Sequence, residues 1–121
     1  MKKIVIIDDE ENIISVLEKY LKRKGKVEIS SFTNAKEAKS DIMAGKYDLV
    51  LLDIMMPEVN GLDLLEEIKK SRPSQKVLMM TAYSTEEKII KSDLVGADDY
   101  ITKPFISLRD VENKIYDHLG I

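Results

Sequence analysis

The sequence contains no cysteine among its 121 residues. This absence excludes disulfide frameworks, thiolate metal sites and cysteine nucleophiles, and it is typical of a reducing compartment, so the cytoplasm is the expected location. Long hydrophobic runs are absent as well, because only four apolar residues stand between Lys3 and Asp8. That is too few for a signal-peptide core or a membrane-spanning helix, and we expect neither.

Clustered positive charge is also lacking. The chain has 19 Lys and Arg against 22 Asp and Glu, a formal net charge of -3, and its lysines are scattered. Binding to a phosphate backbone depends on clustered basic residues, so we expect no direct binding to nucleic acid. The basic run 22–24 is interpreted as helix-dipole partners and solubilising charges, and the single histidine, His118, as a surface residue without metal-ligating neighbours.

Three continuous apolar runs predict strands buried on both faces, the pattern of a parallel sheet covered by helices. They span residues 4–7, 49–52 and 77–80, and they end at Asp8, Asp53 and Thr81. Residues 27–32 alternate apolar and polar side chains, which favours an edge strand, and residues 100–102 form a short last strand. Helical spacing or caps mark the segments between and after them, namely 13–21, 35–43, 62–68, 84–96 and 108–119.

Five strands alternating with five helices indicate the α/β class, with a doubly wound parallel sheet in a three-layer, flavodoxin-like sandwich. Because the first, third and fourth strands are the most apolar, we expect the strand order 2-1-3-4-5. A chain of 121 residues forms one domain, residues 1–121. In this order the first and third strands are neighbours, so Asp8, Asp9 and Asp53 should meet in the crevice at their carboxyl ends.

Three converging carboxylates repel each other unless a cation joins them, and oxygen ligands without Cys or His favour Mg²⁺. The remaining strand ends supply the hydroxyl of Thr81 and the ammonium of Lys103, both suited to phosphoryl oxygens. The set predicts a phosphoryl-transfer site with a carboxylate nucleophile.

The sequence resembles the receiver domains of two-component response regulators over its whole length. Four motifs carry the resemblance: Asp8-Asp9 after the first strand, Asp-Ile-Met-Met-Pro-Glu-Val-Asn-Gly at 53–61, Thr81-Ala82, and Gly-Ala-Asp-Asp-Tyr-Ile-Thr-Lys-Pro-Phe at 96–105. The resemblance implies that Asp53 accepts a phosphoryl group from a sensor histidine kinase or a histidine phosphotransfer protein. It also implies that Asp9, Asp53 and the Met55 carbonyl bind Mg²⁺ and that Asp8 acts through water.

The same resemblance implies that Lys103 pairs with the phosphoryl group and that its bond to Pro104 is cis. Thr81 would move toward the phosphate, and Tyr100 would turn from exposed to buried. The helix after Thr81, the strand bearing Tyr100 and the last helix would then signal to an unidentified protein partner. We expect no enzyme activity beyond the chain's own phosphorylation and dephosphorylation, and we hypothesise that Met55 and Tyr83 hinder water and lengthen the phosphorylated lifetime.

Three other functions compete with this interpretation. A magnesium-dependent phosphohydrolase with an aspartyl nucleophile usually has a second acid two residues later, where this chain has Met55. A flavodoxin-like nucleotide binder needs a loop of backbone amides after the first strand, which the acids at 8–11 would oppose. A receiver-fold binding module that acts without phosphorylation normally lacks one of the acids, the Thr or the Lys.

Overall fold

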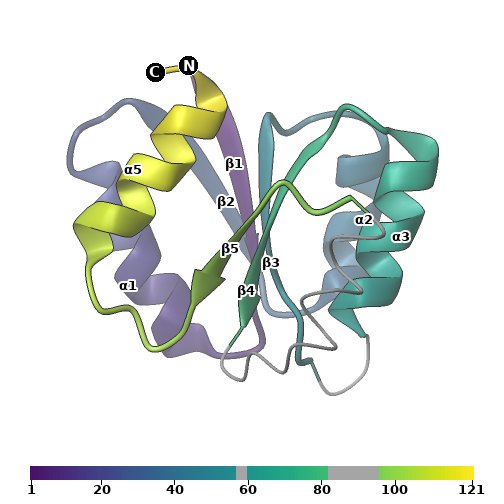
Figure 1. Cartoon of the computed structure of the whole chain (residues 1–121), viewed down its shortest axis with the longest axis horizontal. Helices are drawn as coiled ribbons and strands as arrows, with labels where there is room; N and C mark the ends of the chain where they lie inside the picture. The colour runs from purple at the N-terminus through teal and green to yellow at the C-terminus, as the bar shows by residue number, and fades with distance from the viewer. Residues whose placement is uncertain (57–59, 82–95) are drawn as a thin grey trace.

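The computed structural model describes residues 1–56, 60–81 and 96–121. One five-stranded parallel sheet runs through the molecule in the order β2-β1-β3-β4-β5, which confirms the expected topology (Figure 1). The strands are β1 (Lys2–Ile7), β2 (Val27–Phe32), β3 (Leu49–Asp53), β4 (Lys76–Thr81) and β5 (Asp99–Thr102).

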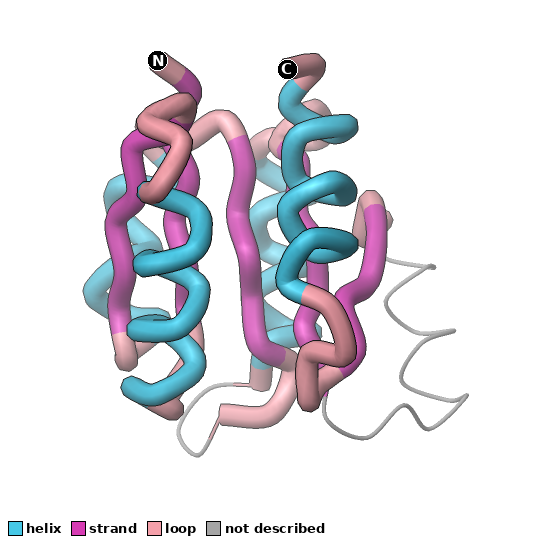
Figure 2. The backbone as a smooth tube through the Cα atoms, turned by 90° about the vertical axis from the view of Figure 1, so that its left-hand side faces the viewer, coloured by secondary structure: helices cyan, strands magenta, loops and turns pink. Residues whose placement is uncertain are grey.

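The described helices cover both faces of this sheet. They are α1 (Glu11–Lys22), α2 (Ala35–Met43), α3 (Gly61–Ser71) and α5 (Leu108–Leu119). Helices α1 and α5 lie on one face, and α2 and α3 lie on the other (Figures 1 and 2). Each face has its own apolar cluster, so the three layers of the predicted sandwich enclose two cores. The expected helix at 84–96 lies outside the described residues.

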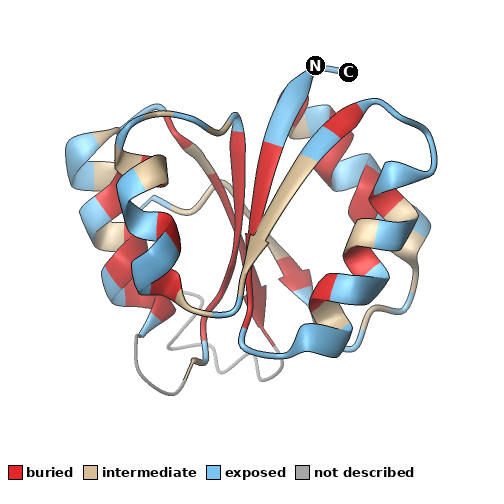
Figure 3. Ribbon diagram, turned by 180° about the vertical axis from the view of Figure 1, so that it is seen from behind, coloured by how far each residue is buried: buried red, intermediate tan, exposed pale blue. Residues whose placement is uncertain are grey.

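The buried strands explain why the chain takes this fold. Every residue of β3 is buried, and so are the last four of β1 and the last five of β4 (Figure 3). Strands that are apolar on both faces lose the most contact with water when helices cover both sides. In the outer strand β2 only Val27 is buried, which confirms its expected edge position.

The register of the paired strands determines which strand ends lie next to each other. Ile7 of β1 lies opposite Leu52 of β3, so the residues that follow them, Asp8 and Asp53, stand side by side at the same edge of the sheet. Thr81 at the end of β4 pairs with Thr102 of β5, one residue before Lys103. The four predicted side chains therefore reach one end of the sheet.

Local signals set several helix boundaries. Asn34 caps α2, because its side chain accepts a hydrogen bond from the Lys36 N–H at 2.8 Å. Asn60 caps α3 in the same way through the Leu62 N–H at 2.9 Å. Helix α3 ends at Ser71, before Pro73. Neither Asp8 nor Asp9 caps α1, whose N-cap residue is Glu10.

Two groups of surface charges make contacts that the sequence did not predict. Arg23 and Lys24 do more than solubilise the chain, because each places a nitrogen 3.1 Å from Oε1 of Glu112, which is 1% exposed. His118 is partly buried, and its Nε2 lies 3.0 Å from Oδ2 of Asp99. Both interactions join α5 to a segment that is distant in the sequence, so they tie this helix to the sheet layer and to the end of α1.

Gly61 is required where the β3–α3 connection turns back on itself. Its N–H donates to the Ile54 carbonyl at 3.1 Å. A Cβ atom at Gly61 would lie 2.2 Å from the Asp53 carbonyl oxygen and 2.9 Å from Ile54 Cα. Both contacts are with backbone, so a side chain here must displace the loop that follows Asp53.

We therefore expect Gly61→Ala to lower the free energy of unfolding by at least about 2 kcal/mol, since overpacked backbone contacts are strongly destabilising. The matched control is Gly25→Ala, where φ is +64° but no atom lies within 4 Å of the added Cβ. The control variant should lose only about 1 kcal/mol of unfolding free energy, because its alanine must adopt a left-handed backbone conformation but meets no other atom. Urea denaturation of both variants measures the difference, and equal losses would contradict the steric argument.

Candidate functional site

Four buried polar side chains gather at the carboxyl end of the sheet. Asp8 is fully buried, Asp53 and Thr81 are 2% exposed, and Lys103 is 5% exposed. They come from the ends of β1, β3, β4 and β5, the positions where ligands bind in open α/β sheets. Buried charges of this kind are costly unless they are paired, so their gathering needs either mutual pairing or a ligand.

Lys103 pairs with the acids. Its Nζ lies 2.6 Å from Oδ2 of Asp8 and 3.4 Å from Oδ2 of Asp53, with Oε1 of Glu10 at 3.8 Å. Burial alone would lower the pKa of Lys103, but its contact with Asp8 and the charge of Asp53 outweigh burial and raise it. The ammonium therefore stays protonated and bridges the two buried carboxylates.

The environment of Asp53 disfavours its charge. Burial, and after it the negative charge of Asp8, raises the pKa of Asp53 to about 6, although Lys103 and the backbone N–H of Met55 act in the opposite direction. The Met55 N–H lies 3.4 Å from Asp53 Oδ1, a weak contact. One ammonium thus compensates the two carboxylates only in part, and a further cation would complete the charge balance.

The donor atoms at the site suit a hard divalent cation. Carboxylate oxygens of Asp8, Asp9 and Glu10 all lie within 4.8 Å of one another, with Asp8 buried and the other two exposed. Oxygen-only clusters of mixed exposure are what Mg²⁺ prefers, because it keeps part of its water shell. Asp8 and Asp9 of the predicted ligands belong to this cluster, Asp53 does not, and the Mg²⁺ ligands stay a prediction. Glu10 was not predicted, although its place beside Asp9 in the acidic run could have indicated it.

The loop after Asp53 is held from two sides. The Ile54 N–H donates to the Met80 carbonyl at 3.0 Å, and Met55 forms an isolated bridge with Asn60. Met55 is 50% exposed, so its side chain does not pack in the core. Residues 57–59 of this loop lie outside the described residues.

On the β5 side of the site, the structure confirms the predicted cis bond. The Lys103–Pro104 peptide is cis, as the resemblance implied. The Lys103 N–H donates to the Thr81 carbonyl at 2.8 Å, which fixes the two residues to each other. Tyr100 is partly buried and packs against the apolar cluster on the α2 and α3 face, so it lies between the exposed and buried states that the resemblance implied, and its predicted movement stays a prediction. Tyr83 lies outside the described residues.

Comparisons with known proteins agree with this geometry. The family model for the response regulator receiver domain matches residues 4–116. The response regulator SaeR of Staphylococcus aureus is 37% identical over 105 residues, which cover 87% of this chain and 45% of SaeR. The chain thus spans less than half the length of this curated relative.

Solved structures share the fold over nearly the whole chain. A CheY-like receiver domain protein from Methanospirillum hungatei JF-1 is 34% identical with a TM-score of 0.89, covering 99% of this chain and 94% of that one. The BeF3-activated receiver domain of DrrB, a Thermotoga maritima protein, is 28% identical with a TM-score of 0.83, covering 100% and 99%. With the family match over residues 4–116, these findings show that the chain belongs to the response regulator receiver domain family.

Proposed function

We propose that Asp53 accepts a phosphoryl group from a phosphohistidine of a sensor histidine kinase or a histidine phosphotransfer protein. The observation that carries this proposal is the buried Lys103 ammonium within 3.4 Å of both Asp8 and Asp53 at the carboxyl end of the sheet. Membership of the receiver family supports a kinase as the partner. The chain would act only on itself, so it is a signalling protein and not an enzyme for a separate substrate.

The transfer is an in-line displacement. An ionised Asp53 oxygen forms a bond to phosphorus while the phosphorus–nitrogen bond to histidine breaks, and the imidazole nitrogen keeps that electron pair. With a pKa of about 6, Asp53 is mostly ionised near neutral pH even before a cation binds. Its burial removes the water shell that would otherwise weaken the nucleophile.

Lys103 is placed to compensate the arriving charge. In the structure its ammonium is shared between Asp8 and Asp53, and phosphorylation would add further acceptor oxygens beside the same nitrogen. Mg²⁺, held by Asp8, Asp9, Asp53 and, by family resemblance, the Met55 carbonyl, would neutralise charge on the phosphoryl oxygens. Glu10 adds a carboxylate at the exposed side of this set.

Phosphorylation would be read through β4 and β5. The Thr81 carbonyl accepts a hydrogen bond from the Lys103 N–H, and β4 pairs with β5 along Leu78 to Thr81. A movement of Thr81 would therefore displace β5, the strand that carries Tyr100. Helix α5 is tied to the same strand by Lys114 and His118, which both contact Asp99. We propose that this β5–α5 surface, with the segment after Thr81, changes its population of states and binds a downstream protein.

The setting of the protein follows the same proposal. In the ranges 1–56, 60–81 and 96–121, no helix is both long and apolar enough to cross a membrane. We propose that the chain works in the cytoplasm, where a kinase domain and a downstream protein can reach it, and that it contacts no nucleic acid directly.

The first prediction of this proposal is stable addition of one phosphate. Incubation with Mg²⁺ and a small phosphodonor should increase the mass of the wild-type chain by a single phosphate, because the site supplies the nucleophile and the compensating charges. Asp53→Asn should gain none, and removal of Mg²⁺ by chelation should prevent the reaction. If the wild type gained no phosphate from small donors or histidine kinases, the chain would act as a binding module without phosphorylation.

The raised pKa of Asp53 also predicts a stability effect in the absence of divalent cations. Between the ordinary value of 3.8 and about 6, the folded chain holds a proton that the unfolded chain releases, so stability falls as pH rises through this window. Asp53→Asn removes the penalty and should be stabilised relative to wild type by about 2 kcal/mol at about pH 8, with little difference at about pH 4.

Denaturation in a chelator measures this pH dependence, and Asp117→Asn, an exposed acid on α5, is the matched control. Added Mg²⁺ should stabilise the wild type at the higher pH and affect Asp53→Asn less, because the cation binds the folded acid cluster. An equal gain for Asp53→Asn at both pH values would show that Asp53 carries no electrostatic penalty.

The exposed Met55 predicts control of the phosphorylated lifetime. Met55→Asn should speed dephosphorylation by about three- to tenfold, since a smaller polar side chain lets water reach the phosphoryl group and lowers the barrier by about 1 kcal/mol. Release of inorganic phosphate from purified phosphorylated protein gives the rate. The double variant Met55→Asn with Tyr83→Ala tests both residues together. A dephosphorylation rate equal to that of the wild type would contradict the hypothesis.

A further inference from the structure

Strand β2 forms an open edge of the sheet. It pairs with β1 on one side, and no other strand in the described part of the chain pairs with it. The outward backbone N–H and C=O groups of an edge strand are able to pair with another extended chain. Edge strands therefore usually carry a feature that discourages such pairing.

Of the usual protective features, β2 carries only one charged side chain, the exposed Glu28. Natural edges are blunted by lysine, proline, bulges or short length. Strand β2 has six residues, Val27–Phe32, with an unbroken register against Lys2–Ile7 and neither lysine nor proline. The opposite edge strand, β5, has four residues, and Lys114 Nζ donates to its Tyr100 carbonyl at 2.7 Å. The two edge strands thus differ in length and in the lysine that contacts the backbone of β5.

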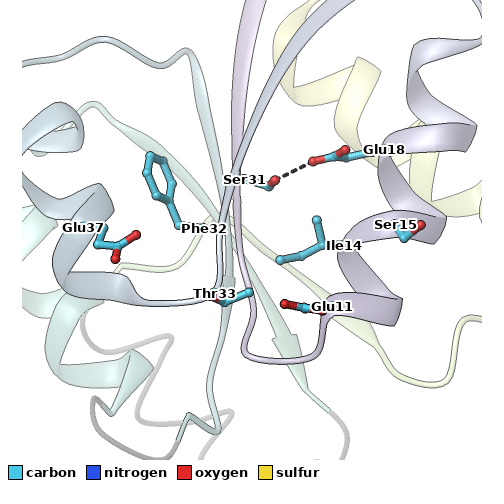
Figure 4. A pocket seen from close by; sticks show the side chains of 8 residues that line it. All are labelled: Glu11, Ile14, Ser15, Glu18, Ser31, Phe32, Thr33 and Glu37. Carbon is cyan, nitrogen blue, oxygen red and sulfur yellow. Dashed lines mark hydrogen bonds between the residues drawn. The ribbon is translucent and has the colours of Figure 1, made fainter.

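A hollow of about 380 Å³ opens beside the carboxyl end of β2. Its lining residues are Glu11, Ile14, Ser15, Glu18, Ser31, Phe32, Thr33 and Glu37. Figure 4 shows Glu11 and Glu18 on the α1 side of the strand and Glu37 on the α2 side. Glu18 accepts a hydrogen bond from the Ser31 hydroxyl and lies 3.7 Å from the exposed Lys22. The lining itself contains three acids and no basic residue.

A second hollow, of about 240 Å³, lies farther along the same strand. It is lined by Lys3, Glu28, Ser30, Asp41, Lys46 and Tyr47. Ser30 and Ser31 are consecutive in β2, so their side chains point to opposite faces of the sheet. An added strand would alternate its side chains in the same way, so one set would lie on the side of Glu11 and Glu18 and the other set on the side of Glu37 and of the second hollow.

We propose that the free edge of β2 binds an extended segment of a partner protein that carries lysine or arginine. Backbone pairing with β2 would supply affinity, and the basic side chains would reach the glutamates of the first hollow. A second copy of this chain is disfavoured as the occupant, because pairing two such edges would bring their glutamates together. The proposal does not depend on phosphorylation of Asp53.

The test uses a capped hexapeptide that alternates lysine and valine, titrated into the ¹⁵N-labelled, unphosphorylated chain. We expect saturable shifts of the amide signals of residues 29–33 at millimolar peptide. A peptide N-methylated at every amide keeps the charges but has no N–H donor on either edge and cannot pair with a strand, so it should produce no such shifts. Changing Glu11 and Glu18, which lie on the same side of β2, together to Gln should weaken binding about fivefold, as expected for two exposed ion pairs.

The control variant changes Glu66 and Asp117, acids on α3 and α5, and should bind the peptide as the wild type does. Equal binding of the N-methylated peptide would reduce the effect to charge attraction and overturn the proposal. So would the absence of shifts at residues 29–33, or shifts centred on other elements. Concentration-dependent self-association through the β2 amides without peptide would identify a second copy as the occupant and would also overturn it.

Discussion

The site depends on one buried ammonium. Lys103 lies within 3.4 Å of both Asp8 and Asp53, and without it two carboxylates that are almost fully buried would face each other unpaired. Removing one partner of such a set leaves an uncompensated buried charge, which costs about 3 kcal/mol or more. Because the compensation is incomplete, the pKa of Asp53 stays raised, and this incomplete compensation is the physical basis of the cation and phosphoryl binding that we propose.

The rest of the fold serves to place these charges. Strands β1, β3 and β4 are buried on both faces, so their positions are fixed by two apolar cores and not by the site itself. Gly61 lets the β3–α3 connection approach the backbone at Asp53, and the Lys103 N–H bond to Thr81 connects the ends of β4 and β5. A rigid scaffold of this kind holds reacting groups in place despite their mutual repulsion.

The two edges of the sheet differ in the same physical terms. At β5, side chains of α5 bind the strand, with Lys114 on the Tyr100 carbonyl and His118 on Asp99. At β2, the described residues leave the outer backbone groups open beside an acidic hollow. These differences underlie the two roles that we propose, signalling to α5 at the β5 edge and binding of another chain at the β2 edge.

The sequence by itself determined the strands, their order and the meeting of the acids. Apolar runs that end at Asp8, Asp53 and Thr81 require burial on both faces, and the doubly wound order then brings those ends together. Only the tertiary structure decided the pairing of Glu112 with Arg23 and Lys24, the contact of His118 with Asp99, and the place of Glu10 near Lys103. The sequence around these residues does not show which side chains will pair. A charged side chain is stable in a buried position only when a partner lies beside it, and here the partner comes from a distant part of the chain.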